Sequence, residues 1–597
     1  MSLSFEDAVS SATAPGGRFE LAPASLPGAD GISRDQFVFV NAPKSLRALF
    51  DSLRTREGVF LVYEDDRRTF AEVMVEVDAL AYALVHRYGL SPGDRVGIAM
   101  RNFPEWIVSF AAITSVGGVA VCLNGWWTPD ELAYGLHDSG CSVVFADVER
   151  VARIAPLLNQ NADPENADPE KSRRAPLHVV AVRDDGEALP DGVDRWDDVV
   201  VRGAAMPDVP IDPHADATIL YTSGTTGDPK GAVSSHHAVL SALLSFGCRS
   251  VVQGILKTAA ALPDGQLTQP AVPANPTSFI LTVPLFHVTG LVPVMLGAVL
   301  GGSKLVMMRK WNPERALELI EREQVTTFVG VPTMSWDLLE SPDFARRDTS
   351  SLVSVGGGGA PAPPELVKRI DSSFSKGRPS IGYGMTETNG YGPQNLADDY
   401  VRKPTSAGRT IPTMQVRVVA DDGEVVPSGE VGEIEFRGPN LIRGYWNKPD
   451  ATAATFHDGW LRTGDLGRLD DEGFVYVVDR AKDMVLRAGE NVYCAEIEAV
   501  LYEHPAVYEV AVFGLPHERL GEEVAVAVVL RVDHAAVGVD AAALQVHVQG
   551  RLAAFKVPTQ VFFHTEQLPR GATGKILKRE LRDRVLSGVS VSQTPQN

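Results

Sequence analysis

The sequence predicts an α/β fold in which helices cover mostly parallel sheets, followed by a β-rich subdomain and a small α+β domain. Three observations favour this class. The 597 residues exceed one ordinary hydrophobic core. From about residue 46, apolar strands alternate with segments of helical period. Beyond Gly408 the pattern changes to short strands with turns, and a mixed helix and strand pattern closes the chain.

The alternation determines how the elements should be arranged. Because helices that alternate with apolar strands connect parallel strands, the sheet should be parallel and covered by helices. The expected helices are 46–53, 69–88, 104–116 and 128–139, and the expected strands are 60–63, 96–100, 118–122, 142–146, 279–283, 325–331 and 353–355. The closing unit should contain helices at 496–503, 541–554 and from 576, with strands at 507–513 and 524–532.

Four stretches show little periodicity. Residues 1–45 are rich in Ala, Gly, Pro and Ser, which predicts an extended surface arm or partial disorder. The tandem repeat within 157–175 indicates a surface-loop insertion, and 256–276 indicates a second one or a lid over a pocket. The tail, 587–597, is polar and expected to be disordered.

Composition narrows the choice of partners and compartment. The net charge of −21 argues against nucleic acid and anionic membranes as general partners. The four cysteines are scattered, which indicates neither a disulfide framework nor a zinc site and fits the cytoplasm. The N-terminus lacks signal-peptide features, and the apolar segment 279–300 is interrupted by prolines and glycines, so no transmembrane segment is predicted. Peripheral membrane contact and a homodimer stay open.

Residues 221–233, Tyr-Thr-Ser-Gly-Thr-Thr-Gly-Asp-Pro-Lys-Gly-Ala-Val, have the composition of a phosphate loop. They lie between an expected strand at 217–220 and the start of a helix at 236–244. Gly224 and Gly227 permit close backbone approach to an anion, the hydroxyls add donors, and Lys230 supplies charge. The spacing excludes the Walker pattern, and a flexible surface turn is the alternative.

Several further polar loops follow expected strands, each of which alone also fits an ordinary turn. His287 follows the strand 279–283, where open α/β sheets bind ligands, although a core histidine is the alternative. A run of four glycines at 356–359 permits close approach of a ligand or forms a loose turn. Tyr-Gly-Met-Thr-Glu at 383–387 offers an aromatic face, a hydroxyl and a carboxylate.

Taken together, these motifs resemble the adenylate-forming superfamily, which includes acyl-CoA synthetases, luciferases and peptide-synthetase adenylation domains. The resemblance covers roughly residues 46–584 and rests on the loop 221–231, Tyr-Gly-Met-Thr-Glu, Thr-Gly-Asp at 463–465 and Pro-Arg-Gly-Ala-Thr-Gly-Lys at 569–575, in the family's order. It implies two half-reactions: a carboxylate attacks the α-phosphorus of ATP to give acyl-AMP and pyrophosphate, and a thiol then displaces AMP.

The resemblance also implies the domains and the roles of residues. Residues 1–45 would be an arm, 46–481 the AMP-binding domain, 482–586 a mobile C-terminal domain and 587–597 a tail, with Lys482 as the hinge. The implied ATP-binding residues are Thr222, Ser223, Gly224, Thr225, Thr226, Lys230, Gly358, Gly359, Ala360, Pro361, Tyr383, Gly384, Met385, Asp465 and Arg480. The implied catalytic residues are Lys575 and Thr386 at the α-phosphate, Glu387 as the Mg²⁺ ligand, and His287 near the carboxylate.

Among the ATP-binding residues that the resemblance implies, Tyr383 would stack on adenine, and Asp465 and Arg480 would bind the ribose. The thiol side would lie at Ala488, Gly489 and Glu490. Two departures fall there: Ala488 stands where many relatives have glycine, and Cys494 where many have proline. Cys494 is interpreted as a packing residue, since this chemistry needs no enzyme thiolate.

The acid should be hydrophobic. The expected acyl pocket, His287, Val288, Thr289, Gly357 and Gly382, contains small and apolar residues and no acidic partner for an ammonium group. A medium- or long-chain fatty acid or another bulky apolar acid is predicted, with an aromatic or steroid-derived acid as the competitor. Coenzyme A is the expected acceptor, loading of a carrier protein is the alternative, and a nucleotide-binding protein without turnover is a third hypothesis.

Overall fold

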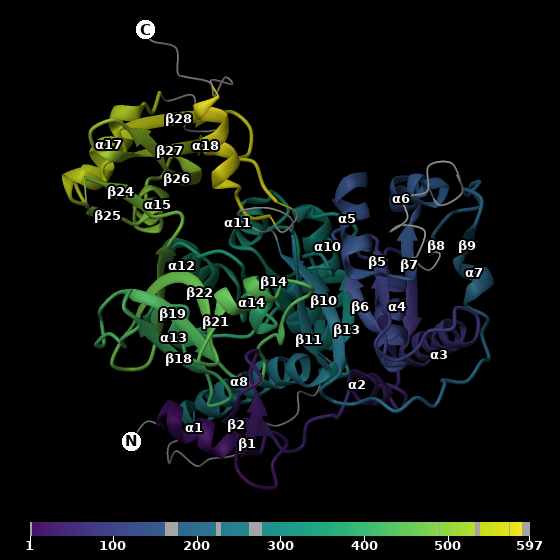
Figure 1. The fold of residues 1–597 in the computed structure, drawn as a ribbon. Coiled ribbons are helices and arrows are strands. Elements are labelled where there is room, and N and C mark those ends of the chain that lie inside the picture. The colour runs from purple at the N-terminus through teal and green to yellow at the C-terminus, as the bar shows by residue number, and fades with distance from the viewer. Residues whose placement is uncertain are drawn as a thin grey trace.

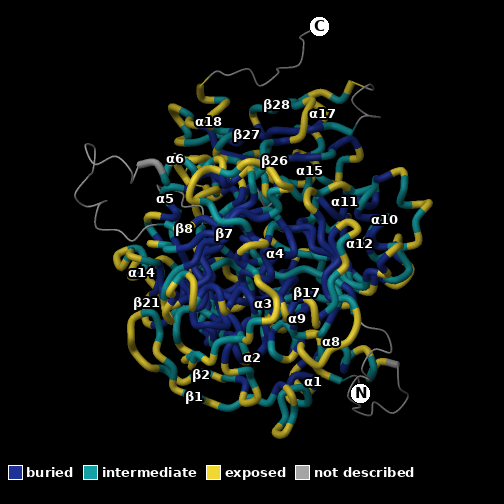
Figure 2. Tube along the Cα trace, turned by 90° about the vertical axis from the view of Figure 1, so that its right-hand side faces the viewer, coloured by how far each residue is buried: buried dark blue, intermediate teal, exposed yellow. Residues whose placement is uncertain are grey.

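The computed structural model describes residues 3–160, 177–222, 229–261, 277–488, 490–531, 538–571 and 574–587. Figure 1 shows a large body of sheets and helices, with the N-terminal arm and the small C-terminal domain at opposite ends. Figure 2 shows that the buried residues concentrate in the sheets and in the helix between them, α4 (Pro104–Ser115). Every residue of α4 is buried.

The first large sheet is parallel over most of its width, as the alternation predicted. Only its hairpin side is antiparallel, where β11 pairs with β10 and β20 pairs with β11. In order across the sheet, the strands are β20 (Gly444–Tyr445), β11 (Lys230–Ser235), β10 (Asp216–Thr222), β6 (Val119–Cys122), β5 (Arg95–Ala99), β7 (Val143–Asp147), β8 (His178–Val182) and β9 (Val193–Arg195).

The second large sheet has six parallel central strands and an antiparallel strand at each edge. In order, the strands are β17 (Gln394–Leu396), β16 (Arg378–Gly382), β15 (Ser354–Gly358), β14 (Thr327–Gly330), β12 (Ser278–Leu281), β13 (Lys304–Met307), β3 (Val59–Tyr63) and β4 (Asp66–Thr69). The carboxyl ends of the parallel strands meet at one edge, where such sheets bind ligands.

Helices cover these sheets. Thr69 and Thr128 begin two of them with capping boxes, in which the threonine and a glutamate three residues later satisfy the free N–H groups. The helices of the large body are α2 (Leu46–Asp51), α3 (Phe70–His86), α4, α5 (Pro129–Ser139), α6 (Val148–Gln160), α7 (Trp196–Val199), α8 (His236–Ala261), η1 (Gly290–Leu296), α9 (Gly297–Gly301), α10 (Pro313–Glu323), α11 (Pro332–Glu340), α12 (Pro364–Ser373), η2 (Thr386–Thr388), α13 (Ala397–Arg402) and α14 (Pro449–Thr455).

A β-rich subdomain and a small α+β domain follow, as predicted. The subdomain sheet contains β18 (Gln415–Val419), β19 (Gly432–Arg437), β22 (Trp460–Leu469), β21 (Phe456–His457) and β23 (Val475–Arg480). The C-terminal domain contains β24 (Val485–Arg487), β25 (Glu490–Val492), α15 (Cys494–Tyr502), β26 (Val507–His517), β27 (Gly521–Leu530), α17 (Ala541–Gln549), η3 (Ala554–Lys556), β28 (Gln560–His564) and α18 (Lys578–Leu586).

The N-terminal arm is folded, so the expectation of an extended or partly disordered segment is wrong. It forms a helix, α1 (Phe5–Ala12), and an antiparallel hairpin of β1 (Leu21–Pro27) and β2 (Ser33–Phe39). Its buried apolar side chains, Phe5, Val9, Phe19 and Phe39, belong to the core of the large body. A few widely spaced anchors thus order a segment whose composition alone suggested disorder.

Three further expectations change. Within 221–233, Tyr221 and Thr222 end β10 and residues 230–233 belong to β11, which pairs with β10 before α8 starts; residues 223–228 lie outside the described residues. The two expected insertions are shorter than predicted, since α6 continues to Gln160 and α8 to Ala261; residues 161–175 and 262–276 lie outside the described residues.

The glycine run is also not a loose turn, because Gly356 to Gly358 belong to β15. A Cβ on Gly357 would stand 1.6 Å from the carbonyl oxygen of Gly330 on the neighbouring strand, so the strand requires glycine there.

Helix α8 is long and apolar enough to cross a membrane by length and composition, and 61% of its most apolar window is buried inside the protein. It packs against the N-terminal arm in Figure 1 and contributes to the core of the large body. A buried core helix passes the same test of length and composition.

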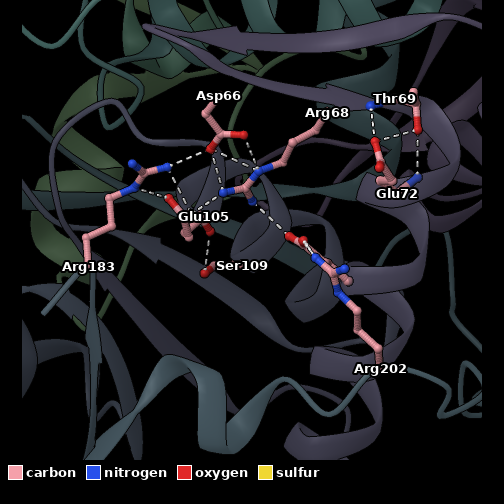
Figure 3. Close-up of polar contacts among 9 residues, drawn as sticks. Asp66, Arg68, Thr69, Glu72, Glu105, Ser109, Arg183 and Arg202 are labelled. Carbon is pink, nitrogen blue, oxygen red and sulfur yellow. Dashed lines mark hydrogen bonds and ion pairs between the residues drawn. The ribbon is translucent and has the colours of Figure 1, made fainter. Parts of the chain in front are cut away.

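A cluster of ion pairs joins β4, α3, α4 and the turn after β8. Figure 3 shows Arg68 and Arg183 pointing toward the carboxylates of Asp66 and Glu105. Arg68 also donates to Glu76 at 2.8 Å, and Arg183 Nε donates to Glu105 at 2.8 Å. Glu76 and Glu105 are 5% exposed, so their charges lie inside the protein and each meets an arginine.

Candidate active site

A single cavity of about 1470 Å³ lies at the carboxyl ends of the parallel strands and receives residues from both domains. It brings most of the predicted site residues together. Those that line it are Thr222, Lys230, His287, Val288, Thr289, Gly357, Gly358, Gly359, Gly382, Gly384, Met385, Thr386, Glu387, Asp465, Arg480, Lys482 and Lys575. Of the other candidates, Ser223, Gly224, Thr225, Thr226 and Gly489 lie outside the described residues.

Glu387 is a buried carboxylate of the cavity, at 6% exposure, as is Asp465. Tyr445 Oη donates a hydrogen bond to its Oε1 at 2.6 Å. Burial raises the pKa of Glu387, and the Tyr445 hydroxyl and the charges of Arg480 and Lys230 oppose that rise. Lys230 Nζ lies 5.2 Å from the centroid of the Tyr445 ring, so this tyrosine contacts both the carboxylate and the lysine.

The residues present fit a magnesium ion. Mg²⁺ in nucleotide sites is held by one or two carboxylates together with phosphate oxygens and retains several waters. One buried carboxylate that lines the cavity beside Thr386 and Lys230 provides this arrangement. No cluster of three or more His, Cys, Asp or Glu residues that could hold a metal by itself occurs among the residues the structure describes.

Asp465 and Arg480 come from neighbouring strands, β22 and β23, and form an ion pair at 3.3 Å. Tyr383 Oη donates to Asp465 Oδ2 at 2.5 Å, and its ring packs against Phe436 at 5.6 Å between centroids. Tyr383, Ala360 and Pro361 are absent from the cavity lining. The stacking of Tyr383 on adenine therefore stays a prediction, and in this structure the tyrosine positions Asp465.

Lys575 reaches the cavity from the C-terminal domain. Desolvation by the surrounding protein, with the like charge of Arg480, lowers the pKa of Lys575 to about 8. Two contacts hold the domain in this orientation: Tyr508 Oη donates to Asp337 at 3.0 Å, and Arg531 pairs with Glu340. Both acceptors belong to α11.

His287 faces the same cavity. Burial, and then the charge of Lys575, lowers the pKa of His287 to about 4, so its imidazole is neutral at pH 7. The backbone N–H of Thr289 donates to Nδ1 of His287 at 3.4 Å. The ring proton is therefore on Nε2, which makes that nitrogen a hydrogen-bond donor without a positive charge.

Family comparisons agree with this geometry. A family model described as AMP-binding enzyme matches residues 51–446, and a model of the AMP-binding enzyme C-terminal domain matches residues 496–575. The chain belongs to the AMP-binding enzyme family. The first match covers more than half of the chain and contains Glu387, and the second ends at Lys575.

Relatives of this AMP-binding enzyme are acid–CoA ligases. The mitochondrial medium-chain acyl-CoA ligase ACSF2 of Mus musculus is 32% identical, covering 89% of this chain and 85% of the relative. Feruloyl-CoA synthase of Amycolatopsis sp is 36% identical, covering 86% and 94%. Among solved structures, ATP-bound MatB from Rhodopseudomonas palustris has a TM-score of 0.76 and 31% identity, covering 91% of this chain and 98% of that chain.

Part of the cavity of this AMP-binding enzyme was not predicted. One face of α8 lines it through Leu243, Phe246, Gly247, Ser250, Val251, Gly254 and Ile255. On the opposite side, polar residues of the second sheet line it: Thr327, Ser354, Ser380 and Gln394. The spacing of three and four along α8 was a readable signal for a single helix face. The sheet residues have no motif, because only strand register brings them to one surface.

Of the thiol-side candidates, Ala488 and Glu490 are described, and neither lines the cavity. Ala488 has φ of +53°, in the left-handed region that favours glycine, which accounts for the glycine expected there. Glu490 is exposed on β25. Cys494 is buried, burial raises the pKa of its thiol, and its Sγ donates to the carbonyl of Asp483 at 3.1 Å. These contacts fit the interpretation of Cys494 as a packing residue.

Proposed function

We propose that this chain is an ATP-dependent acyl-CoA ligase that activates a hydrophobic carboxylic acid as acyl-AMP, releases pyrophosphate and transfers the acyl group to coenzyme A. The observation that carries the proposal is the continuity of the cavity. Glu387, Thr386 and Lys575 line the same space as the apolar face of α8. Two of the relatives reported above are named medium-chain acyl-CoA ligase and feruloyl-CoA synthase, and both names support the same class of reaction.

The residues of the chain suit the adenylation step. A carboxylate that meets triphosphate needs compensation of negative charge and alignment more than a covalent catalyst. Lys575 would supply positive charge at the α-phosphate and Lys230 at the leaving pyrophosphate. His287, neutral at pH 7, would donate from Nε2 to the acid without adding charge. Glu387 and phosphate oxygens would hold Mg²⁺, which would neutralise charge on the phosphates.

The acid-binding part of the cavity supports a hydrophobic acid as the substrate, and one polar feature of it favours a second class of acid. The α8 side is apolar and contains two glycines, Gly247 and Gly254, which leave room for a bulky group. The sheet side carries hydroxyls, and Gln394 Oε1 is buried with no hydrogen-bond partner. An acid with a ring and a hydroxyl substituent would donate to that oxygen, so an aromatic or steroid-derived acid is the second candidate.

Pyrophosphate release with a panel of acids tests the proposal. The panel should contain matched pairs that differ in oxygen substituents, such as cinnamate with ferulate and stearate with 12-hydroxystearate. We expect release above background for at least one hydrophobic acid, and a thioester when CoA is added. Release without a thioester on CoA, but with acyl transfer to acyl carrier protein, would identify the carrier-loading alternative. No release with any acid would refute the proposed activity.

A further inference from the structure

The N-terminal arm is fixed to the helix that lines the cavity. The ring of Phe5 contacts two guanidinium groups, with Arg409 Cζ at 3.9 Å and Arg249 Cζ at 5.0 Å from its centroid. Arg249 belongs to α8 and is 1% exposed, so the contact is inside the protein. Cation–π contacts of desolvated arginines are among the stronger ones, which makes Phe5 an anchor for the arm.

The end of α1 and the link from α1 to β1 reach the cavity itself. Ser11 and Ala12 of α1 line it, as do Arg18 and Phe19 of the link. Contacts with α9 and with the hairpin hold this link: Arg18 Nη2 donates to the carbonyl of Leu300 in α9 at 3.2 Å, and the ring of Phe19 meets Phe39 of β2 edge-on at 6.0 Å. Phe19 is 5% exposed, so its ring is packed and does not swing freely.

Phe19 fills the space beside a glycine of α8. A Cβ on Gly247 would lie 3.2 Å from Phe19 Cζ and 3.3 Å from Leu300 Cδ2. The arm, α8 and α9 therefore meet closely at this point, and Phe19 or Leu300 would have to shift by a few tenths of an ångström to admit one more methyl group. The lining face of α8 runs from Leu243 to Ile255, about 18 Å at 1.5 Å a residue, so the contact lies within the apolar part of the cavity.

We propose that the N-terminal arm is part of the acid-binding site and that Phe19, packed against Gly247, sets the size of acid the enzyme accepts. This inference rests on the proposed function. The ring of Phe19 meets Phe39 edge-on, lies 5.5 Å from Arg18 Cζ, and has its tip beside Gly247. Among the described residues, its aromatic and cation–π contacts do not include the phosphate-side candidates Glu387, Asp465 or Lys575. A change at Phe19 should therefore alter selection of the acid and leave ATP binding unchanged.

Two reciprocal variants test the inference on the full-length enzyme. Phe19→Ala should enlarge the cavity and raise the ratio of kcat/KM for large over small acids about tenfold, the range that one or two methylenes confer in apolar pockets. Gly247→Ala should act in the opposite direction, lowering kcat/KM for the largest acid and sparing the smallest. The KM for ATP should stay unchanged in both.

Phe37→Ala is the matched control, because Phe37 belongs to the same N-terminal arm but is 43% exposed. Its acid profile should match that of the unmodified enzyme. The inference is overturned if Phe19→Ala and Gly247→Ala keep the original profile, or if both lose activity equally for all acids. If Phe19→Ala does not fold, the acid-size profile of Gly247→Ala tests the inference by itself. Absence of pyrophosphate release in the unmodified enzyme would instead refute the proposed function.

Discussion

The ion-pair cluster around Arg68 and the cavity around Lys575 shift the pKa of a buried cation in opposite directions. Burial alone would lower the pKa of Arg68, but Glu105, Asp66 and Glu76 outweigh it and raise that pKa. Lys575 has no ion pair with a carboxylate among the described residues, and burial with Arg480 lowers its pKa to about 8. In the cluster, carboxylates of the protein compensate the arginine charges. In the cavity, we expect the phosphates of ATP to compensate the charge of Lys575.

The largest effect should come from removing that cation. In Lys575→Ala, acyl-AMP formation should fall about 100- to 1000-fold, the range seen when one donor to developing negative charge is lost. Thioester formation from preformed acyl-AMP should persist, because that step has no developing charge on the α-phosphate of ATP. Single-turnover assays of each half-reaction measure both rates. Equal losses would show that Lys575 supports the fold or both steps.

Removing a carboxylate from the ion-pair cluster around Arg68 should lower the stability of the fold and leave catalysis unchanged. Glu105→Gln leaves two arginines without their shared carboxylate, which should cost about 3 kcal/mol of the free energy of unfolding. Denaturant titration measures this loss, and the KM for ATP should not change. Glu72→Gln is the control, since Glu72 caps α3 at the surface and its loss should be much smaller. A raised KM for ATP in Glu105→Gln would contradict the separation of the two regions.

The pH profile should report the cation of the cavity directly. Lys575 is charged below its pKa of about 8 and loses the proton as pH rises through that value, so kcat/KM for ATP should fall about tenfold a pH unit above it. The negative charge of bound ATP should raise the pKa of Lys575, so we expect the fall in kcat to begin at higher pH. Lys575→Arg should shift the basic limb upward, because arginine stays protonated. If the basic limb of the pH profile stays in place in Lys575→Arg, a group other than Lys575 causes it.

The sequence could predict residues that lie within local motifs, but not contacts between elements that are distant in the chain. The cavity residues in motifs, such as Thr386 and Glu387, were identified because local spacing places them together after a strand. Tyr445, which contacts Glu387 from 58 residues away in sequence, carries no local signal. Phe5 and Phe19 were missed for the same reason, since their partners on α8 and α9 are brought near only by folding. Alternating periods predicted the sheets, but contacts between distant elements could not be predicted.

A smaller effect is expected at Tyr445, where a neutral group supports the buried carboxylate. Tyr445→Phe keeps the ring beside Lys230 and removes only the hydroxyl that donates to Glu387. Because that hydrogen bond lowers the pKa of Glu387, its loss should raise the pKa further and move the acid limb of kcat/KM to higher pH. The concentration of Mg²⁺ for half-maximal activity should rise about threefold to tenfold, as expected for one hydrogen bond to a charged group. If the acid limb and the magnesium requirement both stay in place, a group other than Glu387 holds the metal.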